Sequence, residues 1–559
     1  MLSEHRAWVR VGLGVVLLGL VVWVYRDAVT GELTNWDDDR FLSANPLFAA
    51  GGWPYVRAAF TQIQWEAYHP LHVLSYLPDR YLWPGWPTGF HLVNLALFVA
   101  DLVLLWRLVR RHASELAALA AVAVFALHPL CVEPAAWVAD RKEPLVVLFF
   151  LLALGRETAH DRPRPRWGAL VLFLCALLSK TSSVCFPVVL FAWLRWIQGR
   201  PLREAVVRSA AYALVTVAVS AVVVVVWRDH GMIVHRAASP VVEVATTLVA
   251  YARHILWPVD LGPAYPLAAQ HPVASVVVCA VALVALAVGW RWLPPRARFT
   301  VVAVGGALAP VSNLMPLTMR MSDRYVFLAM VVLVLPVAAA LDWLWLRTRG
   351  SHSRLRAWRG LIIAVLAVIL GLEARASAEL AASWRSSHAL WAHAVAAQPD
   401  AFLAHLKYAE VLEREQRWSD ALAQLWAAQQ LNPGNPLPGQ RLLHLRARRA
   451  ELAGTLPAGT ALRWLLDSDR AMTDRAAYDR LAAEIDATSC RGCGDAMALF
   501  GLDAWPRSDA ELFTEANRAI DRGLGTRARI YLARVRDRRA PEYADLQHRA
   551  GEQPAASEP

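Results

Sequence analysis

The sequence predicts an all-α fold, in which a polytopic membrane part with about eleven transmembrane helices precedes a soluble helical part. Of the 559 residues, 57% are hydrophobic and only 18% are charged, an apolar share above that of ordinary soluble proteins. The apolar residues gather in runs that end near residue 376. The formal charge of +11 falls in short clusters between these runs, as in cytoplasmic loops of membrane proteins, so nucleic-acid binding is not expected.

Eleven apolar segments precede residue 377. Each is a candidate span, because about 17 to 25 residues cross a hydrocarbon core about 30 Å thick. They lie near residues 8–25, 88–109, 115–133, 143–156, 167–180, 183–197, 207–227, 272–292, 300–316, 325–346 and 360–376. We expect the first to be retained as an anchor, because no convincing small-residue cleavage site follows it.

Arginine clusters predict the orientation of these segments, because cytoplasmic loops carry the excess of positive charge. The clusters fall on every second connecting segment. They are Arg6 and Arg10; Arg107, Arg110 and Arg111; Arg162, Arg164 and Arg166; Arg200, Arg203 and Arg208; Arg291, Arg296 and Arg298; and Arg347, Arg349, Arg354, Arg356 and Arg359. We therefore expect an inner (cytoplasmic) membrane protein with a cytoplasmic N terminus and a periplasmic C-terminal domain.

The first outward-facing loop, residues 26–87, is too long for a simple connector. It contains "NWDDDRFLSANP", with three consecutive carboxylates at Asp37, Asp38 and Asp39. The loop is also rich in Trp and Tyr, which settle at membrane interfaces, so we expect short helices lying on the bilayer. A helix N-cap or a solvated turn is the alternative role for the three aspartates.

Four further outward-facing stretches carry ionisable residues at or near membrane depth, where charge is costly and usually marks a site. The stretches are 125–144, 177–183, 251–266 and 315–328, and their candidates are Glu133, Arg141, Lys142, Lys180, Asp323 and Arg324. Two of the three lysines in the chain are among them. The alternative is that these residues snorkel or form structural pairs between neighbours, such as Asp140 with Arg141 or Asp323 with Arg324.

Residues 377–545 form the predicted soluble helical domain, followed by a disordered tail at 546–559. Within 384–433, similar residues recur at an offset of 34, a period typical of tetratricopeptide repeats. The recurring pairs are Ala394 with Ala428, Pro399 with Pro433 and Trp391 with Leu425. The grooves of tetratricopeptide domains bind peptides, so we expect a protein or peptide acceptor or partner at this domain.

Cysteine and histidine spacing gives no metal site. Cys490 and Cys493 form a lone C-x-x-C, for which we favour a structural disulfide; a zinc site would need a second ligand pair, and a redox motif a βαβ context. His69 and His72 are only three residues apart, and His69 is better explained as a loop contact. A divalent metal is conceivable but not indicated.

Several motifs together resemble a known family. They are "NWDDDRFLSANP", "YHPLHVLSYLPDRYLW", "GFHLVNLALF", "FALHPLCVEPAAWVADRKEPLVVLFFLLAL", "LLSK", "HILWPVDLGPAYP" and "SDRYVFL". In this order, over roughly residues 30–435, the chain looks like a bacterial relative of the membrane-embedded O-mannosyltransferases with tetratricopeptide repeats, of the GT-C glycosyltransferase superfamily. The resemblance implies a polyprenyl-phosphate-linked sugar as the donor and maps an acidic pair of the first loop to Asp37 and Asp38.

The implied chemistry needs a base near the acceptor hydroxyl and positive charge near the departing phosphate. A single carboxylate opposite the leaving group would give inversion by direct displacement. We therefore expect Asp37 and Asp38 to be catalytic and Arg141, Lys142, Lys180 and Arg324 to hold the phosphate. The expected donor sugar is mannose or another hexose, and the expected acceptor is a Ser or Thr of a protein. We expect these substrates to be positioned by His69, His91, His128, Glu133, Asp323 and Tyr325.

Three other functions fit parts of the sequence. A ligase or polymerase of lipid-linked glycans would share the many-helix frame and differ in donor size. A transporter would be expected to show internal repeats with paired broken helices, and the sequence shows no such halves. The repeats could also make the chain an assembly scaffold without activity.

Overall fold

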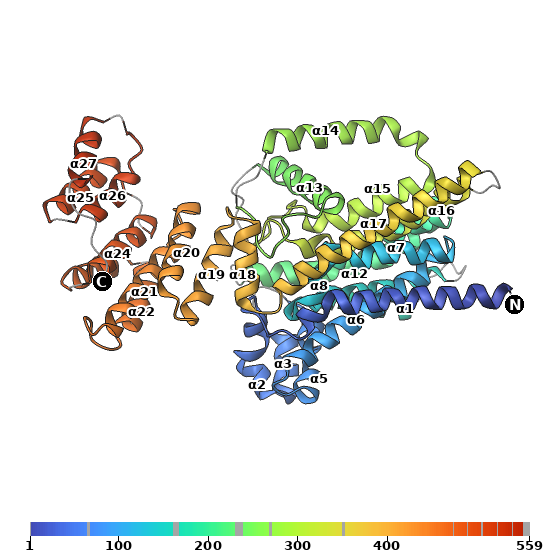
Figure 1. The fold of residues 1–559 in the computed structure, drawn as a ribbon, viewed down its shortest axis with the longest axis horizontal. Helices are drawn as coiled ribbons and strands as arrows, with labels where there is room; N and C mark the ends of the chain where they lie inside the picture. Colours follow the sequence, from blue (N-terminus) through green and yellow to red (C-terminus); the bar gives the residue numbers. More distant parts are fainter. Residues whose placement is uncertain are drawn as a thin grey trace. The chain divides into compact units, whose positions relative to one another are not determined.

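The computed structural model describes residues 2–63, 68–159, 167–229, 239–267, 271–348, 353–472, 474–488, 490–504, 507–522, 524–538 and 540–551. Every regular element within these ranges is a helix (Figure 1), which confirms the predicted all-α class. The chain divides into two compact units, residues 1–398 and 399–559.

The first unit contains the long apolar helices and the short helices of the first loop. Its helices are α1 (Leu2–Val29), α2 (Pro46–Ala50), α3 (Gly52–Thr61), α4 (Pro70–Leu74), α5 (Leu77–Leu82), α6 (Pro87–Val109), α7 (Glu115–Leu127), α8 (Val132–Ala136), α9 (Lys142–Thr158), α10 (Trp167–Ser179), α11 (Phe186–Ala192), α12 (Leu202–Asp229), α13 (Pro240–Leu256), α14 (Pro272–Gly289), α15 (Pro295–Leu308), α16 (Phe327–Arg347), α17 (Ser353–Ser383) and α18 (Ser387–Ala397).

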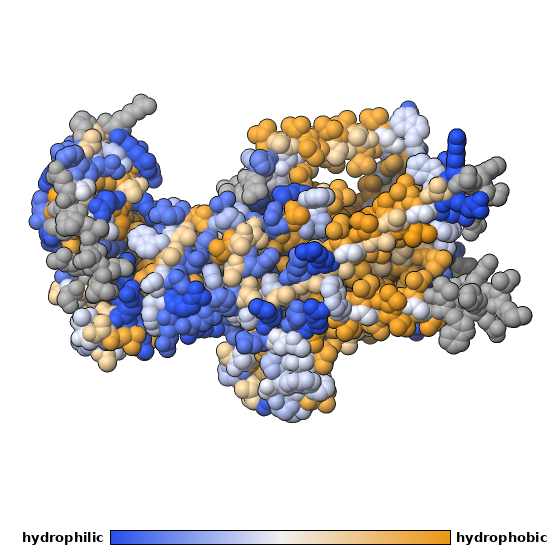
Figure 2. Space-filling view, viewed as in Figure 1, coloured by the Kyte–Doolittle hydropathy of each residue, from blue (hydrophilic) through white to orange (hydrophobic). Residues whose placement is uncertain are grey.

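Six described helices are long and apolar enough to cross a membrane: α1, α6, α12, α14, α16 and α17. Their apolar side chains face outward, as with Val273 and Leu372, which are 77% and 64% exposed; Figure 2 shows this apolar cover over α14 and α17. Such a surface suits lipid rather than water. The chain is therefore a multi-pass membrane protein.

All eleven predicted segments are helical, but not all have the length of a span. The segments near 143–156, 167–180, 183–197 and 300–316 correspond to shorter or interrupted helices. By length and composition, six described helices are candidate spans, or seven if α7 and α8 form one bent span. The predicted number of eleven is not confirmed.

A sharp bend interrupts the predicted segment 115–133. Helices α7 and α8 meet at 67°, with His128 in the extended conformation (φ −70°, ψ 132°) before Pro129. Proline disfavours the helical conformation of the residue before it, so the helix ends there. Residues 132–142 follow the bend, and almost all of their side chains are buried inside the first unit.

Short helices α2 to α5 occupy the first loop, as its length and composition predicted. Pro46 and Pro70 begin two of them, where the missing proline N–H would have no helical partner in any case. Tyr55 donates to the carbonyl oxygen of Val73 at 2.9 Å, which joins α3 to α4. The location of these helices on the bilayer stays a prediction.

The second unit is built from paired helices around one apolar core. They are α19 (Phe402–Arg414), α20 (Trp418–Leu431), α21 (Leu437–Leu452), α22 (Thr460–Ala471), α23 (Arg475–Asp486), α24 (Arg491–Ala504), α25 (Asp509–Asp521), α26 (Gly525–Ala533) and α27 (Pro541–Gly551). Helix α27 takes in the first residues of the predicted tail 546–559, and residues 552–559 lie outside the described part. The arginines predicted to be cytoplasmic at 162, 164 and 166 and Arg349 also lie outside it.

Candidate functional site

Asp38 is a buried anchor of the acidic loop. Its Oδ2 accepts hydrogen bonds from the Thr34 N–H at 2.7 Å and the Thr34 hydroxyl at 2.9 Å, and its Oδ1 accepts from the N–H of Ala139 at 2.7 Å. The side chain is fully buried. Asp38 therefore ties the acidic loop to the segment that precedes Arg141 and Lys142.

Burial, the largest effect on Asp38, raises the pKa of its carboxyl to about 7, while the hydrogen bonds from Thr34 and Ala139 lower it. The charge of Asp37 raises it slightly further. Three donors around one carboxyl group suit the ionised form. The buried position opposes that form, so Asp38 titrates close to neutral pH.

Asp37 differs from Asp38 in both backbone and exposure. Its φ is +70°, in the left-handed region that few non-glycine residues adopt, although aspartate does so more readily than most. Its side chain is 24% exposed and its Oδ1 lies 3.2 Å from Nη1 of Arg40. The backbone thus turns sharply at Asp37 and leaves its carboxylate partly open.

Aromatic stacking fixes the loop on the other side of Asp37. The rings of Trp36 and Trp137 stack with centroids 5.9 Å apart, and Trp36 meets Trp391 edge to face at 5.2 Å. Oδ1 of Asn35 accepts from Nε1 of Trp391 at 2.6 Å. Since aromatic pairs and buried hydrogen bonds hold a defined geometry, Asp37 lies on a rigid support.

Arg141 is enclosed in a set of contacts that we call the arginine clamp: Arg141, Asp79 and Asn94, with the carbonyl oxygens of Ser75 and Phe90. Its Nη2 lies 2.5 Å from Oδ2 of Asp79, its Nε donates to Oδ1 of Asn94 at 2.5 Å, and its Nη1 and Nη2 donate to the two carbonyl oxygens at 3.0 Å each. The side chain is completely buried.

Lys142, Lys180 and Arg324 form a second group, the cation cluster. Nζ of Lys142 and Nε of Arg324 lie 3.8 Å and 3.9 Å from the same oxygen, Oδ1 of Asp140. Lys180 and Arg324 both face the ring of Tyr325, at 5.6 Å and 5.3 Å from its centroid. The charge of Asp37 also acts on Lys142 and raises the pKa of its ammonium, although burial lowers that pKa overall.

The cation cluster differs from the arginine clamp because some of its N–H groups are not used in hydrogen bonds to the protein. Within the described residues, Nζ of Lys142 makes no hydrogen bond and its side chain is 15% exposed. Lys180 donates to Oε1 of Glu143, which leaves two of its three N–H groups available. An ammonium or guanidinium with unused donors can receive a phosphate.

Glu133 holds Arg324 in place. Its Oε1 accepts from Nη1 of Arg324 at 2.5 Å and its Oε2 accepts from the backbone N–H of Arg324 at 3.1 Å. The ring of Trp137 lies below the guanidinium at 5.0 Å. Carboxylate and ring together orient the arginine, and the role predicted for Glu133 in positioning donor or acceptor stays a prediction.

His69 joins the cluster from the first loop. Its Nε2 accepts from the N–H of Thr181 at 3.4 Å. Burial lowers the pKa of its imidazole well below the usual value, and the charges of Lys142 and Lys180 lower it further. His69 is therefore neutral at physiological pH and lies near both lysines.

Asp323, which directly precedes Arg324, and His128 make their hydrogen bonds outside the cation cluster. Asp323 receives hydrogen bonds from the Tyr265 hydroxyl and, at 3.1 Å, from the Gly262 N–H. His128 caps the turn after α7 through the Leu130 N–H at 3.2 Å and contacts the Ile255 carbonyl oxygen at 3.1 Å.

His91 lies between backbone carbonyls, with Nδ1 3.0 Å from the oxygen of Ala136 and Nε2 3.4 Å from that of Glu32. These contacts connect helix α6 to the segment before Lys142 and to the segment before the acidic loop. In the described structure His91, His128 and Asp323 contact protein atoms of the fold, and their predicted positioning roles stay predictions.

Sequence reasoning missed the acidic partners of the basic side chains. Asp140 is fully buried, and neither of its oxygens has a hydrogen-bond partner in the described part. Glu143 and Asp79 bind Lys180 and Arg141, so the neighbour pairs Asp140 with Arg141 and Asp323 with Arg324 are not the ones formed. The run of four charges in "ADRKEP" was the available signal for Asp140 and Glu143.

Among the described residues, no group of three or more His, Cys, Asp or Glu side chains is arranged to hold a metal ion. The candidate site consists of a carboxylate, Asp37, whose charge acts on Lys142, and three cations, of which Lys142 and Lys180 retain unused hydrogen-bond donors.

Comparison with known proteins gives partial matches. No protein-family model and no solved structure matches the chain. Protein O-mannosyl-transferase Tmtc2 of Drosophila melanogaster is 33% identical over 188 residues, 30% of this chain and 20% of that protein. Protein O-mannosyl-transferase TMTC4 of Homo sapiens is 32% identical over 146 residues, 21% of this chain and 19% of that protein.

Protein O-mannosyl-transferase Tmtc1 of Drosophila melanogaster is 35% identical over 123 residues, which are 21% of this chain and 14% of that protein. In each of these comparisons the chain spans a fifth or less of the relative. The chain is thus a distant relative of protein O-mannosyl-transferases, similar to them over 21 to 30% of its own length.

Proposed function

We propose that this chain is an inverting GT-C-type glycosyltransferase that moves a sugar, mannose or another hexose, from a polyprenyl-phosphate donor to a hydroxyl of an extracytoplasmic protein. The observation that supports this most is the position of the acidic loop. Asp38 accepts from the N–H of Ala139, three residues before Lys142, and this bond ties the acidic loop that carries Asp37 to the segment that carries Lys142. A base and a phosphate site are the two parts that such a transfer needs.

In the proposed reaction, the acceptor oxygen attacks the anomeric carbon as the bond from that carbon to the phosphate oxygen breaks. Asp37 accepts the proton of the attacking hydroxyl, and its 24% exposure leaves room for an acceptor. Asp38 supports Asp37 through the loop. One carboxylate at the acceptor suits a single displacement with inversion, since retention would need a second, nucleophilic carboxylate.

The departing phosphate gains negative charge, and the cation cluster would receive it. Lys142 and Lys180 offer unused N–H groups, and Arg324 is held in place by Glu133. Arg141 would contribute as the rigid support of Lys142, because its guanidinium is enclosed by Asp79, Asn94 and two carbonyl oxygens. The lipid tail would lie in the bilayer beside the apolar helices.

The proposed orientation follows from the arginine clusters, with the N terminus in the cytoplasm, the site at the outer face of the inner membrane and the C-terminal unit in the periplasm. A C-terminal fusion to a reporter that is active only in the cytoplasm should be silent. A strong signal from that fusion would contradict this orientation.

The second unit would present the protein or peptide acceptor on tetratricopeptide-like helix pairs. Helix α18, the last helix of the first unit, and helix α20 of the second end at Ala397 and Leu431, each two residues before a proline. Ala394 and Ala428, 34 positions apart, are both fully buried. This equivalence supports the 34-residue period, because the small residue recurs where neighbouring helices pack closely.

The phosphate assignment is tested by replacing Lys180 and Arg324 separately with alanine in the purified full chain. With a polyprenyl-phosphate mannose donor and an acceptor peptide, we expect each variant to raise the apparent KM for the donor, because each removes a cation from the phosphate. Lys180→Arg is the sharper probe, since the planar guanidinium of arginine does not replace the compact ammonium of lysine.

The matched control is Lys407→Ala, which removes the third lysine of the chain, on α19 of the second unit. Its donor KM should equal that of the wild type. Wild-type kinetics in both Lys180→Ala and Arg324→Ala would reject the phosphate assignment, provided that the variants are present in the membrane at the normal level.

A further inference from the structure

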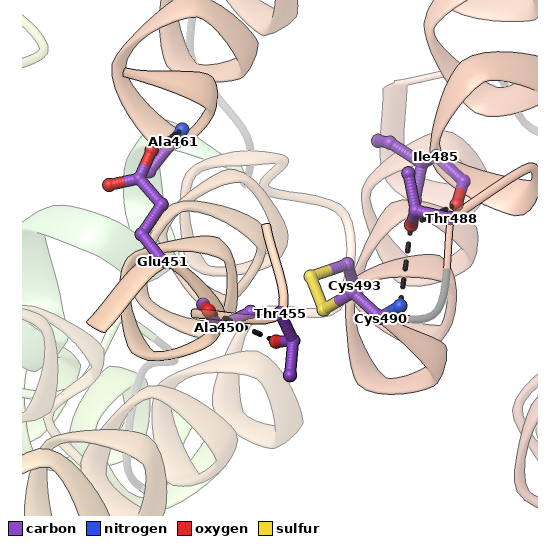
Figure 3. The surroundings of a disulfide bond; sticks show 8 residues. All are labelled: Ala450, Glu451, Thr455, Ala461, Ile485, Thr488, Cys490 and Cys493. Atoms are coloured by element: carbon purple, nitrogen blue, oxygen red, sulfur yellow. Dashed lines mark hydrogen bonds between the residues drawn. A yellow bond between two sulfur atoms is a disulfide. The ribbon is translucent and has the colours of Figure 1, made fainter. Parts of the chain in front are cut away.

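Cys490 and Cys493 form a disulfide across the first turn of α24 (Figure 3). Cys490 directly precedes the helix and Cys493 is its third residue. The backbone N–H groups of Cys493 and Gly494 donate to the carbonyl oxygen of Cys490 at 3.0 Å and 3.4 Å. The disulfide therefore closes a turn that backbone hydrogen bonds already close.

Such a bond offers little to folding. A disulfide stabilises a protein mainly by closing loops in the unfolded chain, and the gain grows with loop length. A separation of three residues closes a very short loop and joins no two elements of the fold. Stability alone therefore gives little reason for the pair.

The two sulfur atoms differ in access. Cys493 is fully buried in the core of the second unit, whereas Cys490 is partly exposed. Thiol–disulfide exchange requires an attacking thiolate to reach one sulfur. Of the two, only Cys490 can be reached without opening the core.

Two arginines lie against the turn. Positive charge and a helix N-terminus both favour a thiolate over a thiol. A methyl group on Gly492, between the cysteines, would overlap Nη1 of Arg446, so this guanidinium lies against the turn. Arg527 lies against Gly494 in the same way and is paired with Asp486 at 2.6 Å and with Asp495 at 3.3 Å; the charge of Arg446 also acts on Asp495.

We propose that Cys490 and Cys493 form a site of thiol–disulfide exchange with an external dithiol. A thiolate of the dithiol attacks Sγ of Cys490, the bond between the two cysteines breaks, and Cys493 leaves with the electron pair and takes up a proton. The second thiol of the partner then attacks the mixed disulfide at its own sulfur and releases Cys490. The partner is oxidised to a disulfide, and the protein pair is reduced by two electrons.

Two matched variants of the full-length protein in detergent test this site, because both lack the disulfide and differ only in the sulfur that remains. Cys493→Ser leaves Cys490, and Cys490→Ser leaves Cys493. With glutathione disulfide as the probe and peptide mass spectrometry as the readout, Cys490 should form the mixed disulfide at least about tenfold faster than Cys493. Equal rates, or an unreactive Cys490, would overturn the proposal.

Charge and folding are tested separately. In the Cys493→Ser background, Arg446→Gln should slow the reaction of Cys490, and Arg446→Lys should largely restore it. In the wild type, dithiothreitol should reduce the pair while the helical circular dichroism of the chain stays unchanged. Reduction that occurs only as the helices unfold would make the disulfide purely structural, whatever the variants do.

Discussion

Arg141 and Lys142 are neighbours in sequence, but they belong to two different kinds of site. In the arginine clamp, the guanidinium of Arg141 contacts one carboxylate, one side-chain amide and two backbone carbonyl oxygens. Lys142 has a carboxylate oxygen 3.8 Å away and the ring of Trp137 at 5.7 Å, makes no hydrogen bond within the described residues and remains partly exposed. The first arrangement satisfies a buried charge within the protein, and the second leaves a charge available to a ligand.

The same contrast separates Asp38 from Asp37. Asp38 is buried with three donors around it, and Asp37 is partly exposed on a left-handed turn. In both pairs the residue with saturated contacts holds its neighbour in position. Full burial with several hydrogen bonds thus marks Arg141 and Asp38 as supporting residues, whereas Lys142 and Asp37 remain partly exposed.

Breaking the clamp should have the largest effect on folding. Arg141→Met leaves the carboxylate of Asp79 buried without its cation, which typically costs about 3 to 5 kcal/mol. We expect little folded protein in detergent, measured by thermal denaturation and by recovery after size-exclusion chromatography. The double variant Arg141→Met/Asp79→Asn should recover part of the loss, and equal stability of Arg141→Met and wild type would remove the distinction between clamp and cluster.

A second test uses the titration of Asp38. Its pKa in the folded chain is about 7, and an unfolded aspartate titrates near pH 4. Between these values the folded state binds more protons, so the free energy of unfolding should fall as the pH rises, by at most about 4 kcal/mol. Denaturation of the wild type and Asp38→Asn at pH 4.5 to 8 measures this difference, and identical pH slopes would contradict the burial argument.

Lys142→Met should have the smallest effect on stability and a visible one on activity. Because the ammonium has no hydrogen bond within the described residues, its loss should change the thermal midpoint little. We expect the donor KM to rise about tenfold, the equivalent of about 1.4 kcal/mol. A large loss of stability with an unchanged KM would make Lys142 part of the support, like Arg141.

Much of the fold was predictable from hydropathy. All eleven apolar segments are helical, and the short helices of the first loop were expected from its length and aromatic content. Helix α13 was not expected as a separate helix, because Glu243, Arg253 and its threonines interrupt the apolar pattern. The bend at His128 was also missed, although Pro129 was a visible signal for it.

The site was predictable in part, because charge at membrane depth selects candidate residues but not their partners. The sequence placed Arg141 and Lys142 together as phosphate ligands. Their different surroundings depend on Asp79 and Asn94, which come from α5 and α6 and meet Arg141 only in the folded chain. Asp140 was overlooked as a site residue for the same reason, since its burial between Lys142 and Arg324 is a tertiary feature.

The most direct measurement of the central claim is the turnover of Asp37→Asn. It should be made beside Asp39→Asn, on purified variants of matched thermal stability, with a defined polyprenyl-phosphate mannose and an acceptor peptide. Loss of a general base lowers the rate about 10²- to 10⁴-fold, so Asp37→Asn should show no detectable transfer, Asp38→Asn a severe loss and Asp39→Asn a mild one. Near wild-type turnover by Asp37→Asn would contradict the catalytic role and leave the acidic loop as a structural turn held by the hydrogen bonds of Asp38.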